Sequence, residues 1–251
     1  MVTPVDPRRP LLWPALVEEL ARSAAEPATL YMVGGMVRDA LLGRPIHDVD
    51  LATPGDGLET ARQLADALGG AYFAVDRERR TGRVILDGAA VSTIDVASFR
   101  GEGLLGDLLG RDFTINAMAV RLDAPQALYD PLGGQRDLFD ERLIRQCTPT
   151  SISSDPIRAL RAVRQSLQFR LALEPVTKLA VRTAASALLG AHGQLDQPER
   201  ARDELFRMLA GPQPAPALRL LSALGLLPAL CPFPLPPAAE LEQRIGLVQT
   251  L

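Results

Sequence analysis

The chain has little cysteine, histidine or lysine. Its two cysteines, Cys147 and Cys231, are too few for a disulfide framework or a zinc cluster. Its two histidines, His47 and His192, are likewise too few for a zinc site supported by cysteine. Lys178 is the single lysine, so arginine carries nearly all of the positive charge. Arginine suits bidentate contact with phosphates and bases.

Long apolar runs are also missing, and we expect no signal peptide. No uninterrupted apolar stretch approaches the length of a membrane helix, and the opening residues MVTPVDPRRP do not resemble a signal peptide. We therefore expect a cytoplasmic protein with no membrane partner. The 251 residues, 47% hydrophobic and 23% charged, allow one large or two small globular domains. The net charge of −3 does not indicate nucleic-acid binding, but a total charge does not reveal local patches.

The most informative stretch is Tyr31–Thr53, YMVGGMVRDALLGRPIHDVDLAT. It predicts a strand, a turn at Gly34 and Gly35, a helix opening with Arg38 and Asp39, and a second strand. Paired glycines let backbone N–H groups approach a phosphate closely. A helix that starts directly after them adds its positive N-terminal dipole, and Arg38 adds a full charge.

The second strand carries two carboxylates. The alternation of Asp48 and Asp50 with Val49 and Leu51 places both carboxylates on one face. Carboxylates held this close repel each other unless a cation lies between them, and oxygen ligands of this kind suit Mg²⁺. An Asp-x-Asp alone is usually a solvated strand end, but its connection to the Gly-Gly turn through one short helix is more specific. Together they predict a nucleoside triphosphate site with metal-assisted phosphoryl transfer.

The rest of the chain divides into a mixed part and a helical part. Leu11–Ala25 and Leu58–Leu68 have the apolar spacing of amphipathic helices. Short strand-like runs follow, bounded by glycine turns, at Ala71–Val75, Arg83–Leu86 and Val91–Phe99. This order predicts an α+β head with a small mixed β-sheet and helices on one side. From Leu171 onward the pattern is helical, with breaks near Gly190–Gly193 and Gly211–Pro216.

These motifs resemble the class II tRNA nucleotidyltransferases and bacterial poly(A) polymerases of the DNA polymerase beta superfamily. The resemblance runs from about Leu11 to Leu230, in the order of the family's motifs. It implies a nucleotidyltransferase head over residues 1–146 and an all-helical neck over residues 147–251 that recognises RNA and base, ending before the family's body and tail. It implies transfer of C, with A left open, from CTP or ATP to the 3′ end of tRNA, with Asp48 and Asp50 holding two Mg²⁺ ions.

The resemblance assigns further residues to the head. Asp95, in VSTIDVASF, matches a third carboxylate that helps a metal or the attacking hydroxyl, although a solvated strand-edge Asp is nearly as well supported. In RDFTINAMA, Arg111 and Asp112 match residues that reach the triphosphate and ribose, and Asn116 faces the same site. The same letters also fit a helix capped by Asp112 or Thr114. The segment DPLGGQRDL, 130–138, matches a structural turn before the neck.

A fourth motif, SSDPIRALRAVR, lies at residues 153–164. Asp155 and Pro156 suit the N-cap and first position of a helix, on which Arg158, Arg161 and Arg164 then share a face. In the family, the residues at Asp155 and Arg158 pair with the base edge of CTP or ATP, because Asp accepts from the exocyclic amine and Arg donates to ring acceptors. The position of Arg161 binds phosphate.

Three departures from the family pattern leave alternatives open. Gly110 stands where the family usually has an arginine, Ser154 where it commonly has a glutamate, and the short segment GEGLLG, 101–106, where CCA-adding enzymes usually have a longer charged loop. Relatives without that loop include enzymes that add only CC. The alternatives are a poly(A) polymerase acting on general RNA, a nucleotidyltransferase acting on a protein or small molecule, and a catalytically reduced paralogue that binds nucleotide or RNA.

Overall fold

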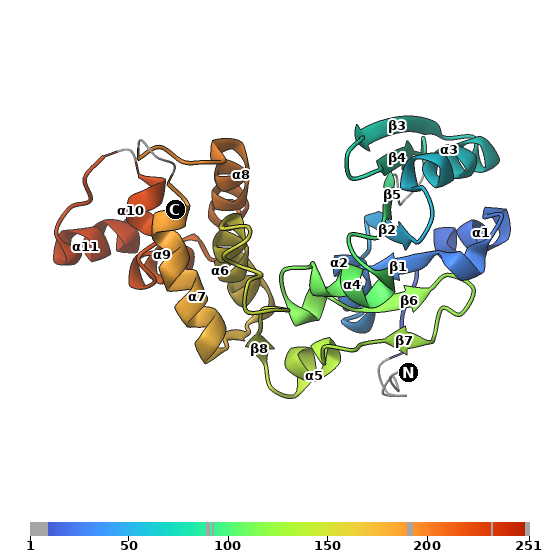
Figure 1. Ribbon diagram of the computed structural model, residues 1–251. Coiled ribbons are helices and arrows are strands. Elements are labelled where there is room, and N and C mark those ends of the chain that lie inside the picture. Colours follow the sequence, from blue (N-terminus) through green and yellow to red (C-terminus); the bar gives the residue numbers. More distant parts are fainter. Residues whose placement is uncertain (1–9, 89–90, 92, 190–192, 232, 249–251) are drawn as a thin grey trace. The chain divides into compact units, whose positions relative to one another are not determined.

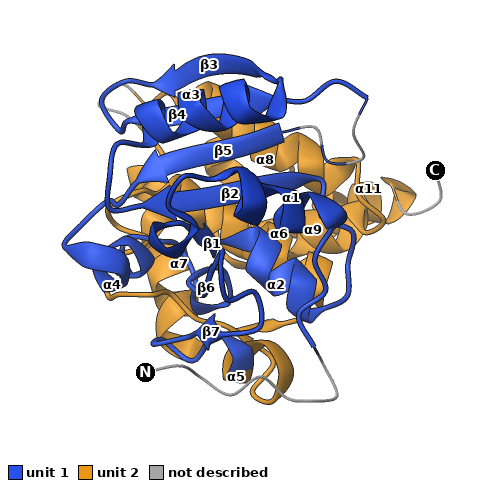
Figure 2. Cartoon of the chain, turned by 90° about the vertical axis from the view of Figure 1, so that its right-hand side faces the viewer, with its two compact units in different colours: residues 1–135 blue, residues 136–251 orange. Residues whose placement is uncertain are grey.

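The computed structural model describes residues 10–88, 91, 93–189, 193–231 and 233–248. The chain forms two compact units, Met1–Gln135 and Arg136–Leu251, which are described separately (Figure 2). The boundary expected from the sequence, after Gln146, stays a prediction. Of the two histidines, His192 lies outside the described residues, as does part of the expected break at 190–193.

Unit 1 is built on a seven-stranded mixed sheet in the order β3-β4-β5-β2-β1-β6-β7 (Figure 1). Neighbouring strands are antiparallel except β2 and β5, which are parallel. A parallel pair needs a long crossover, which α3, β3 and β4 supply here. The strands are β1 (Tyr31–Val33), β2 (Asp48–Thr53), β3 (Ala71–Asp76), β4 (Thr81–Ile85), β5 (Thr93–Ser98), β6 (Ala119–Arg121) and β7 (Leu128–Tyr129).

The helical segments of unit 1 are short. They are α1 (Ala15–Ser23), η1 (Pro27–Thr29), α2 (Gly35–Leu41), α3 (Gly57–Leu68), α4 (Gly103–Leu109) and η2 (Thr114–Asn116), and α5 (Gly134–Phe139) spans the boundary between the units. The Asp56 carboxylate caps the start of α3 by accepting from Leu58 N, 3.0 Å away. At Gly82 in β4, a Cβ atom would lie 2.5 Å from the Ala61 Cβ, so the glycine lets α3 pack closely on the sheet.

The two faces of the sheet differ in character. The face covered by α3 carries apolar side chains that are at most 2% exposed, among them Val49, Leu51, Val84, Ile94 and Val96. Burying each such side chain stabilises the fold by about 1.5–3 kcal/mol. Because side chains alternate along a strand, the residues between them project from the opposite face, where the polar residues of β2, β4 and β5 lie.

Two expectations about local structure need correction. The first helix begins at Ala15 and not at Leu11, because Pro14 holds an extended backbone directly before it. No α-helix forms over RDFTINAMA. Thr114–Asn116 form one 3₁₀ turn, after which the chain enters β6 and pairs with β1, so strand pairing takes the backbone groups that a longer helix would use.

Unit 2 is helical apart from a short parallel pair of strands, β8 (Leu143–Ile144) and β9 (Ala172–Leu173). Its other helices are α6 (Ile157–Phe169), α7 (Pro175–Ala187), α8 (Pro198–Leu209), α9 (Pro214–Ala223), α10 (Leu227–Leu230) and α11 (Ala238–Val248). Buried apolar residues of α6, such as Leu160 and Val163, face the helices around it, α7, α8 and α9.

The turn in DPLGGQRDL is held by one side chain. The Asp130 carboxylate accepts hydrogen bonds from Gly134 N at 2.7 Å and from Gln135 N at 2.8 Å, at the start of α5. Such bonds satisfy two of the backbone donors that a helix leaves free at its start. In the described part of the chain, we find no helix with the length and apolar character needed to cross a bilayer.

Candidate functional site

Three carboxylates lie on the face of the sheet opposite to α3, the open face. Asp48 and Asp50 are two residues apart on β2, and Asp95 lies directly beside Asp50 on β5, because the parallel register pairs these two positions. Side chains at paired positions project from the same face. The structure therefore brings the two carboxylates predicted on β2 next to the third predicted carboxylate.

Burial raises the pKa of Asp50 from 3.8 to about 6. Arg111 and Arg100 oppose this shift, while the neighbouring charges of Asp95 and Asp48 add to it. A carboxyl group that is desolvated and surrounded by like charge is held in an unfavourable state when ionised. A divalent cation beside it would remove that cost, so the electrostatics of this site favour a metal ion.

Asp95 is held by an arginine that the sequence analysis did not identify. Arg83, on β4, donates from Nε and Nη2 to the two carboxylate oxygens of Asp95, both at 2.7 Å. Asp95 is opposite Arg83 in the antiparallel register of β4 and β5. Within the described residues, no three His, Cys, Asp or Glu side chains are arranged to hold a metal ion. The donors that fit Mg²⁺ are Asp48 and Asp50, since this ion commonly binds one or two carboxylates and completes its shell with phosphates and water.

The turn at Gly34 brings an arginine to the acidic pair. Gly34 has φ of 76° and precedes α2, a backbone conformation that favours glycine. A Cβ atom there would lie 2.8 Å from Arg111 Nη1 and 3.8 Å from Asp50 Oδ2. Arg111 is in turn held by the buried Asp107 of α4, whose Oδ2 accepts from its Nη2 at 2.8 Å. The glycine thus leaves room for a cation beside a carboxylate.

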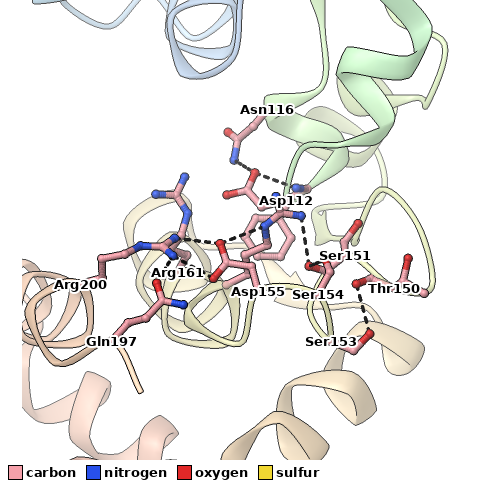
Figure 3. A network of polar contacts seen from close by, with 12 residues as sticks. Asp112, Asn116, Thr150, Ser151, Ser153, Ser154, Asp155, Arg161, Gln197 and Arg200 are labelled. Atoms are coloured by element: carbon pink, nitrogen blue, oxygen red, sulfur yellow. Dashed lines mark hydrogen bonds and ion pairs between the residues drawn. The ribbon is translucent and has the colours of Figure 1, made fainter. Parts of the chain in front are cut away.

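A second network joins α2 to the turn η2. The buried Arg38 donates to Asn116 Oδ1 and pairs with Asp39 at 2.9 Å. Asn116 Nδ2 donates to Asp112 Oδ1 at 2.8 Å (Figure 3). Arg38 is the fourth residue of α2 and not its first, because the positive φ of Gly34 lets the helix begin at Gly35. The structure therefore brings together four of the residues predicted to shape the nucleotide site.

The predicted base-reading residues lie at the start of α6 in unit 2. Asp155 does not cap this helix with its side chain as predicted: Pro156 is the N-cap residue and makes no side-chain cap. The Asp155 carboxylate instead pairs with Arg200 of α8, at 2.8 and 3.2 Å (Figure 3). Arg158 Nε lies 3.6 Å from the same carboxylate, and its Nη1 donates to Ser151 O at 3.1 Å.

The next two arginines of α6 converge on one glutamate. Arg161 Nη1 lies 3.5 Å and Arg164 Nε 2.6 Å from the carboxylate of Glu204, which is only 5% exposed. Arg164 also donates to Gln168 at 3.0 Å. These two arginines therefore share one face of α6, as predicted, and both pair with the same glutamate on α8.

Four residues that organise these sites were missed from the sequence. Asp107 precedes Arg111 by four positions, a spacing that could have indicated their pairing. The alternation of side chains along β4 could have placed Arg83 on the open face, but its partner is decided by the register of β4 against β5. Arg200 and Glu204 lie in a segment predicted only as a neck helix, and no local signal points to their partners on α6.

Comparison with known proteins identifies the family. Residues 30–145 match the family described as Poly A polymerase head domain, and residues 170–235 match the probable RNA and SrmB-binding site of polymerase A. A crystal structure of a tRNA nucleotidyltransferase complexed with a primer tRNA and an incoming ATP analog superposes with a TM-score of 0.76 at 30% identity, covering 92% of this chain and 67% of that one. The chain belongs to the tRNA nucleotidyltransferase and poly(A) polymerase family.

Other tRNA nucleotidyltransferases align over most of this chain. It is 39% identical over 217 residues to a CC-adding tRNA nucleotidyltransferase from Geobacter sulfurreducens, covering 86% of this chain and 48% of the relative. It is 40% identical over 220 residues to an A-adding tRNA nucleotidyltransferase from Deinococcus radiodurans, covering 87% and 47%. The chain spans about half the length of these curated relatives. The family assignment also establishes the nucleotidyltransferase fold of unit 1, with its mixed sheet.

Proposed function

We propose that this chain transfers a nucleotide from CTP to the 3′ end of an RNA, most specifically a tRNA, with release of pyrophosphate. The observation that carries the proposal is the position of Asp48 and Asp50 on the open face of the sheet, with Gly34 and Arg111 directly beside them. This arrangement combines acidic oxygen ligands with a glycine turn and a cation suited to phosphate. The names of the relatives support tRNA as the acceptor.

The acidic pair would hold two Mg²⁺ ions. Mg²⁺ bound there would lower the pKa of the attacking 3′-hydroxyl and neutralise charge on the leaving pyrophosphate. Asp48 and Asp50 supply the oxygen ligands, and the buried position of Asp50 disfavours its charge unless a cation is present. The charge of Asp50 would therefore favour binding of the metal together with the triphosphate.

The remaining head residues would position the nucleotide. Arg111, aimed past Gly34 and held by Asp107, would contact the triphosphate, for which a guanidinium offers bidentate hydrogen bonds. Asp112 and Asn116, already joined by a hydrogen bond, would contact the ribose. Gly35, Arg38 and Asp39 would shape the pocket through the network around Arg38.

Asp95 would act as a positioning group. Both of its carboxylate oxygens accept hydrogen bonds from Arg83, and this cation beside them disfavours a metal ion at Asp95. Its place beside Asp50 supports a role in orienting the incoming hydroxyl. This favours the assignment of Asp95 to the hydroxyl over its assignment to a metal.

In unit 2, Asp155 and Arg158 would read the base, and Arg161 and Arg164 would supply positive charge. Asp155 accepts from an exocyclic amine, which both CTP and ATP carry, and Arg158 donates to ring acceptors. Arg200 holds the Asp155 carboxylate by two hydrogen bonds, which fixes its orientation. Glu204 does the same for the two arginines.

The segment that distinguishes CC addition from CCA addition is short and largely helical here. Gly103–Leu109 form α4, and its Asp107 fixes Arg111. A helix tied to the nucleotide pocket has little freedom to reshape it for a second kind of base. This observation favours addition of C alone, with A addition by the same chain as the second candidate.

The test is extension of a tRNA that lacks its 3′ end, with Mg²⁺ and with CTP, ATP or both, read as product length on a denaturing gel. Extension by C alone, even with ATP present, is the expected result. Extension through A with both nucleotides makes the chain a full CCA enzyme, and a ladder with ATP alone makes it a poly(A) polymerase. Labelling of a protein or small molecule without RNA, or CTP binding without any product, would contradict the proposal.

A further inference from the structure

The open face of the sheet extends beyond the acidic residues. The register places Phe73 of β3 opposite Arg83, Arg83 opposite Asp95, and Asp95 beside Asp50, so one row of side chains crosses four strands. Strands are about 4.8 Å apart, which puts Phe73 about 14 Å from Asp50 along the row. This row connects the edge of the sheet to the proposed reaction centre.

Phe73 is an exposed aromatic residue on the edge strand β3. Its side chain is 51% exposed, and Ile85, on the same face of β4, is 37% exposed. The neighbouring Tyr72 projects from the other face, where Arg62 of α3 lies over its ring, 5.3 Å from the centroid. The open face therefore presents an aromatic ring and an aliphatic side chain to solvent, whereas Tyr72 on the opposite face of β3 lies against α3.

The same edge is locally basic. From Asp76 to Arg83 the chain has four arginines against two carboxylates, whereas the whole chain has a net charge of −3. Arg83 keeps about two fifths of its side chain exposed while it pairs with Asp95 through Nε and Nη2. An aromatic ring beside an arginine is the combination that binds single-stranded nucleic acid, through base stacking and contact with the phosphate.

The two sides of the acidic pair differ. On one side β2 adjoins β1, which is followed by Gly34 and the cation of Arg111, the residues proposed for the triphosphate. On the other side lie β5, β4 and β3 with Asp95, Arg83 and Phe73. A transfer reaction needs the nucleotide and the acceptor on opposite sides of the reacting atoms, and this second side is free of the proposed nucleotide residues.

We propose that Phe73, Arg83 and Ile85, the β3–β4 surface, bind the single-stranded 3′ end of the RNA acceptor. The ring of Phe73 stacks on a base a short distance before the reacting 3′ nucleotide, and Arg83 contacts a phosphate between that base and Asp50. Ile85 supports the base from the neighbouring strand. This inference rests on the proposed function and assigns the acceptor side of that same site.

The experiment measures binding of a labelled RNA hairpin with a single-stranded 3′ tail, and of the same hairpin with a blunt end, by fluorescence anisotropy. Phe73→Ala should weaken binding of the tailed hairpin about tenfold, since stacking on one aromatic ring contributes on that order. Binding of the blunt hairpin and of CTP should stay unchanged. Phe73→Trp should retain binding, and Phe233→Ala, which removes a ring that is 77% exposed in unit 2, is the matched control.

The failures of the two proposals are distinguishable. Suppose that the unmodified chain extends RNA, and that Phe73→Ala binds the tailed hairpin as tightly as the unmodified chain binds it. The β3–β4 surface is then not the acceptor site, and the proposed function stands. If the unmodified chain binds neither hairpin, both proposals fail. An exposed edge strand can also bind a second copy of the chain, and sedimentation of the Phe73→Ala variant tests this. Dissociation of a dimer on this substitution would show that the surface binds a second copy, and would overturn the inference.

Discussion

Asp50 and Asp95 occupy paired positions on two parallel neighbouring strands, β2 and β5. The pairing explains why these two carboxylates, 45 positions apart in the sequence, act on each other's charge. Asp95 has an ion-pair partner in Arg83, whereas Asp50 is desolvated and is repelled by both Asp95 and Asp48. Asp50 is therefore the member of the cluster whose negative charge is least favourable, and a metal beside it would stabilise that charge.

Asp50→Asn should stabilise the metal-free protein at high pH. The pKa of Asp50, raised by burial to about 6, lies above its ordinary value of 3.8, so the native state holds this proton more tightly than the unfolded state does. The resulting stability is fully present below about pH 4 and is lost as the pH rises through 6. The variant should thus gain up to about 3 kcal/mol at pH 8 but only about 1 kcal/mol at pH 4.5.

Denaturant unfolding with EDTA present measures this gain. The fluorescence of Trp13 reports on unit 1, because this single tryptophan donates its indole N–H to Pro125 O at 2.6 Å. Asp66→Asn, at an exposed position of α3, is the matched control and should show no gain at either pH. A lower stability of Asp50→Asn than of the unmodified chain at pH 8 would mean that the carboxylate is not strained.

Arg83→Gln should tighten metal binding. The Arg83 charge interacts with Asp48 and Asp50 as well as with its partner Asp95, so it opposes a cation at the acidic pair. Without it, the affinity for Mn²⁺, as a substitute for Mg²⁺, should rise on the order of fivefold. Electron paramagnetic resonance of free Mn²⁺, titrated without RNA or nucleotide, gives the affinity directly.

The control for Arg83 is Arg62→Gln. Arg62 lies over Tyr72 on the opposite face of the sheet, so its removal changes the total charge equally without changing the acidic face. If both variants bind Mn²⁺ with the same affinity, the effect of Arg83 is one of total charge and the account of the cluster is wrong.

Gly34→Ala should weaken CTP binding by about tenfold or more. A methyl group there would lie 2.8 Å from Arg111 Nη1, closer than any normal contact, so the guanidinium of Arg111 would have to shift from its position near Asp50. A lost hydrogen bond to a charged group costs about 1.5–3 kcal/mol. Gly69→Ala is the control, because Gly69 has a similar positive φ of 68° but no atom within 4 Å of its Cβ position.

Equilibrium dialysis with labelled CTP separates the two variants. Gly69→Ala should lose about 1 kcal/mol of folding stability, because Gly69 has the ordinary left-handed conformation with ψ of 26°. Gly34→Ala should lose more, up to about 3 kcal/mol, because its ψ of −143° lies in a region that is almost restricted to glycine. Gly69→Ala should bind CTP normally. Equal loss of CTP binding in both would attribute the effect to strain and leave Arg111 without a role at the phosphates.

Glu204→Ala should destabilise unit 2 by about 2 kcal/mol. The substitution removes the shared partner of Arg161 and Arg164, of which Arg164 is only 17% exposed, and it leaves a partly buried charge uncompensated. Thermal unfolding followed by circular dichroism measures the loss. Glu240→Ala breaks an exposed pair with Arg244, which contributes well under 1 kcal/mol, and should be nearly neutral. A neutral Glu204→Ala would show that α8 does not fix these arginines.

Local patterns predicted much of the site, and long-range register decided the rest. The alternation of Asp48 and Asp50 is a period of two that any strand enforces, so their common face was predictable. The pairing of Asp95 with Arg83 depends on how β4 and β5 align, which no local pattern determines. In the same way, the residues next to Asp155 predicted that its carboxylate caps a helix. In the structure this carboxylate is bound by Arg200, which is distant in the sequence.

The short turn at Thr114 shows the same limit. Its residues fit a capped helix by propensity, yet the chain must reach β6 within a few residues to pair with β1. Tertiary pairing therefore overrides the local preference. The result benefits the site, because the tight turn places Asn116 between Arg38 and Asp112.

The most direct test of the central claim is transfer of label from α-³²P-CTP to a tRNA that lacks its 3′ end, comparing Asp50→Asn with Asp66→Asn in the presence of Mg²⁺. The account predicts labelled, lengthened RNA from the unmodified chain and from Asp66→Asn, and a rate lower by roughly 10³-fold for Asp50→Asn, since metal stabilisation of the transition state contributes several kcal/mol. Equal rates for the two variants would contradict the assignment of nucleotide transfer to the acidic pair on β2.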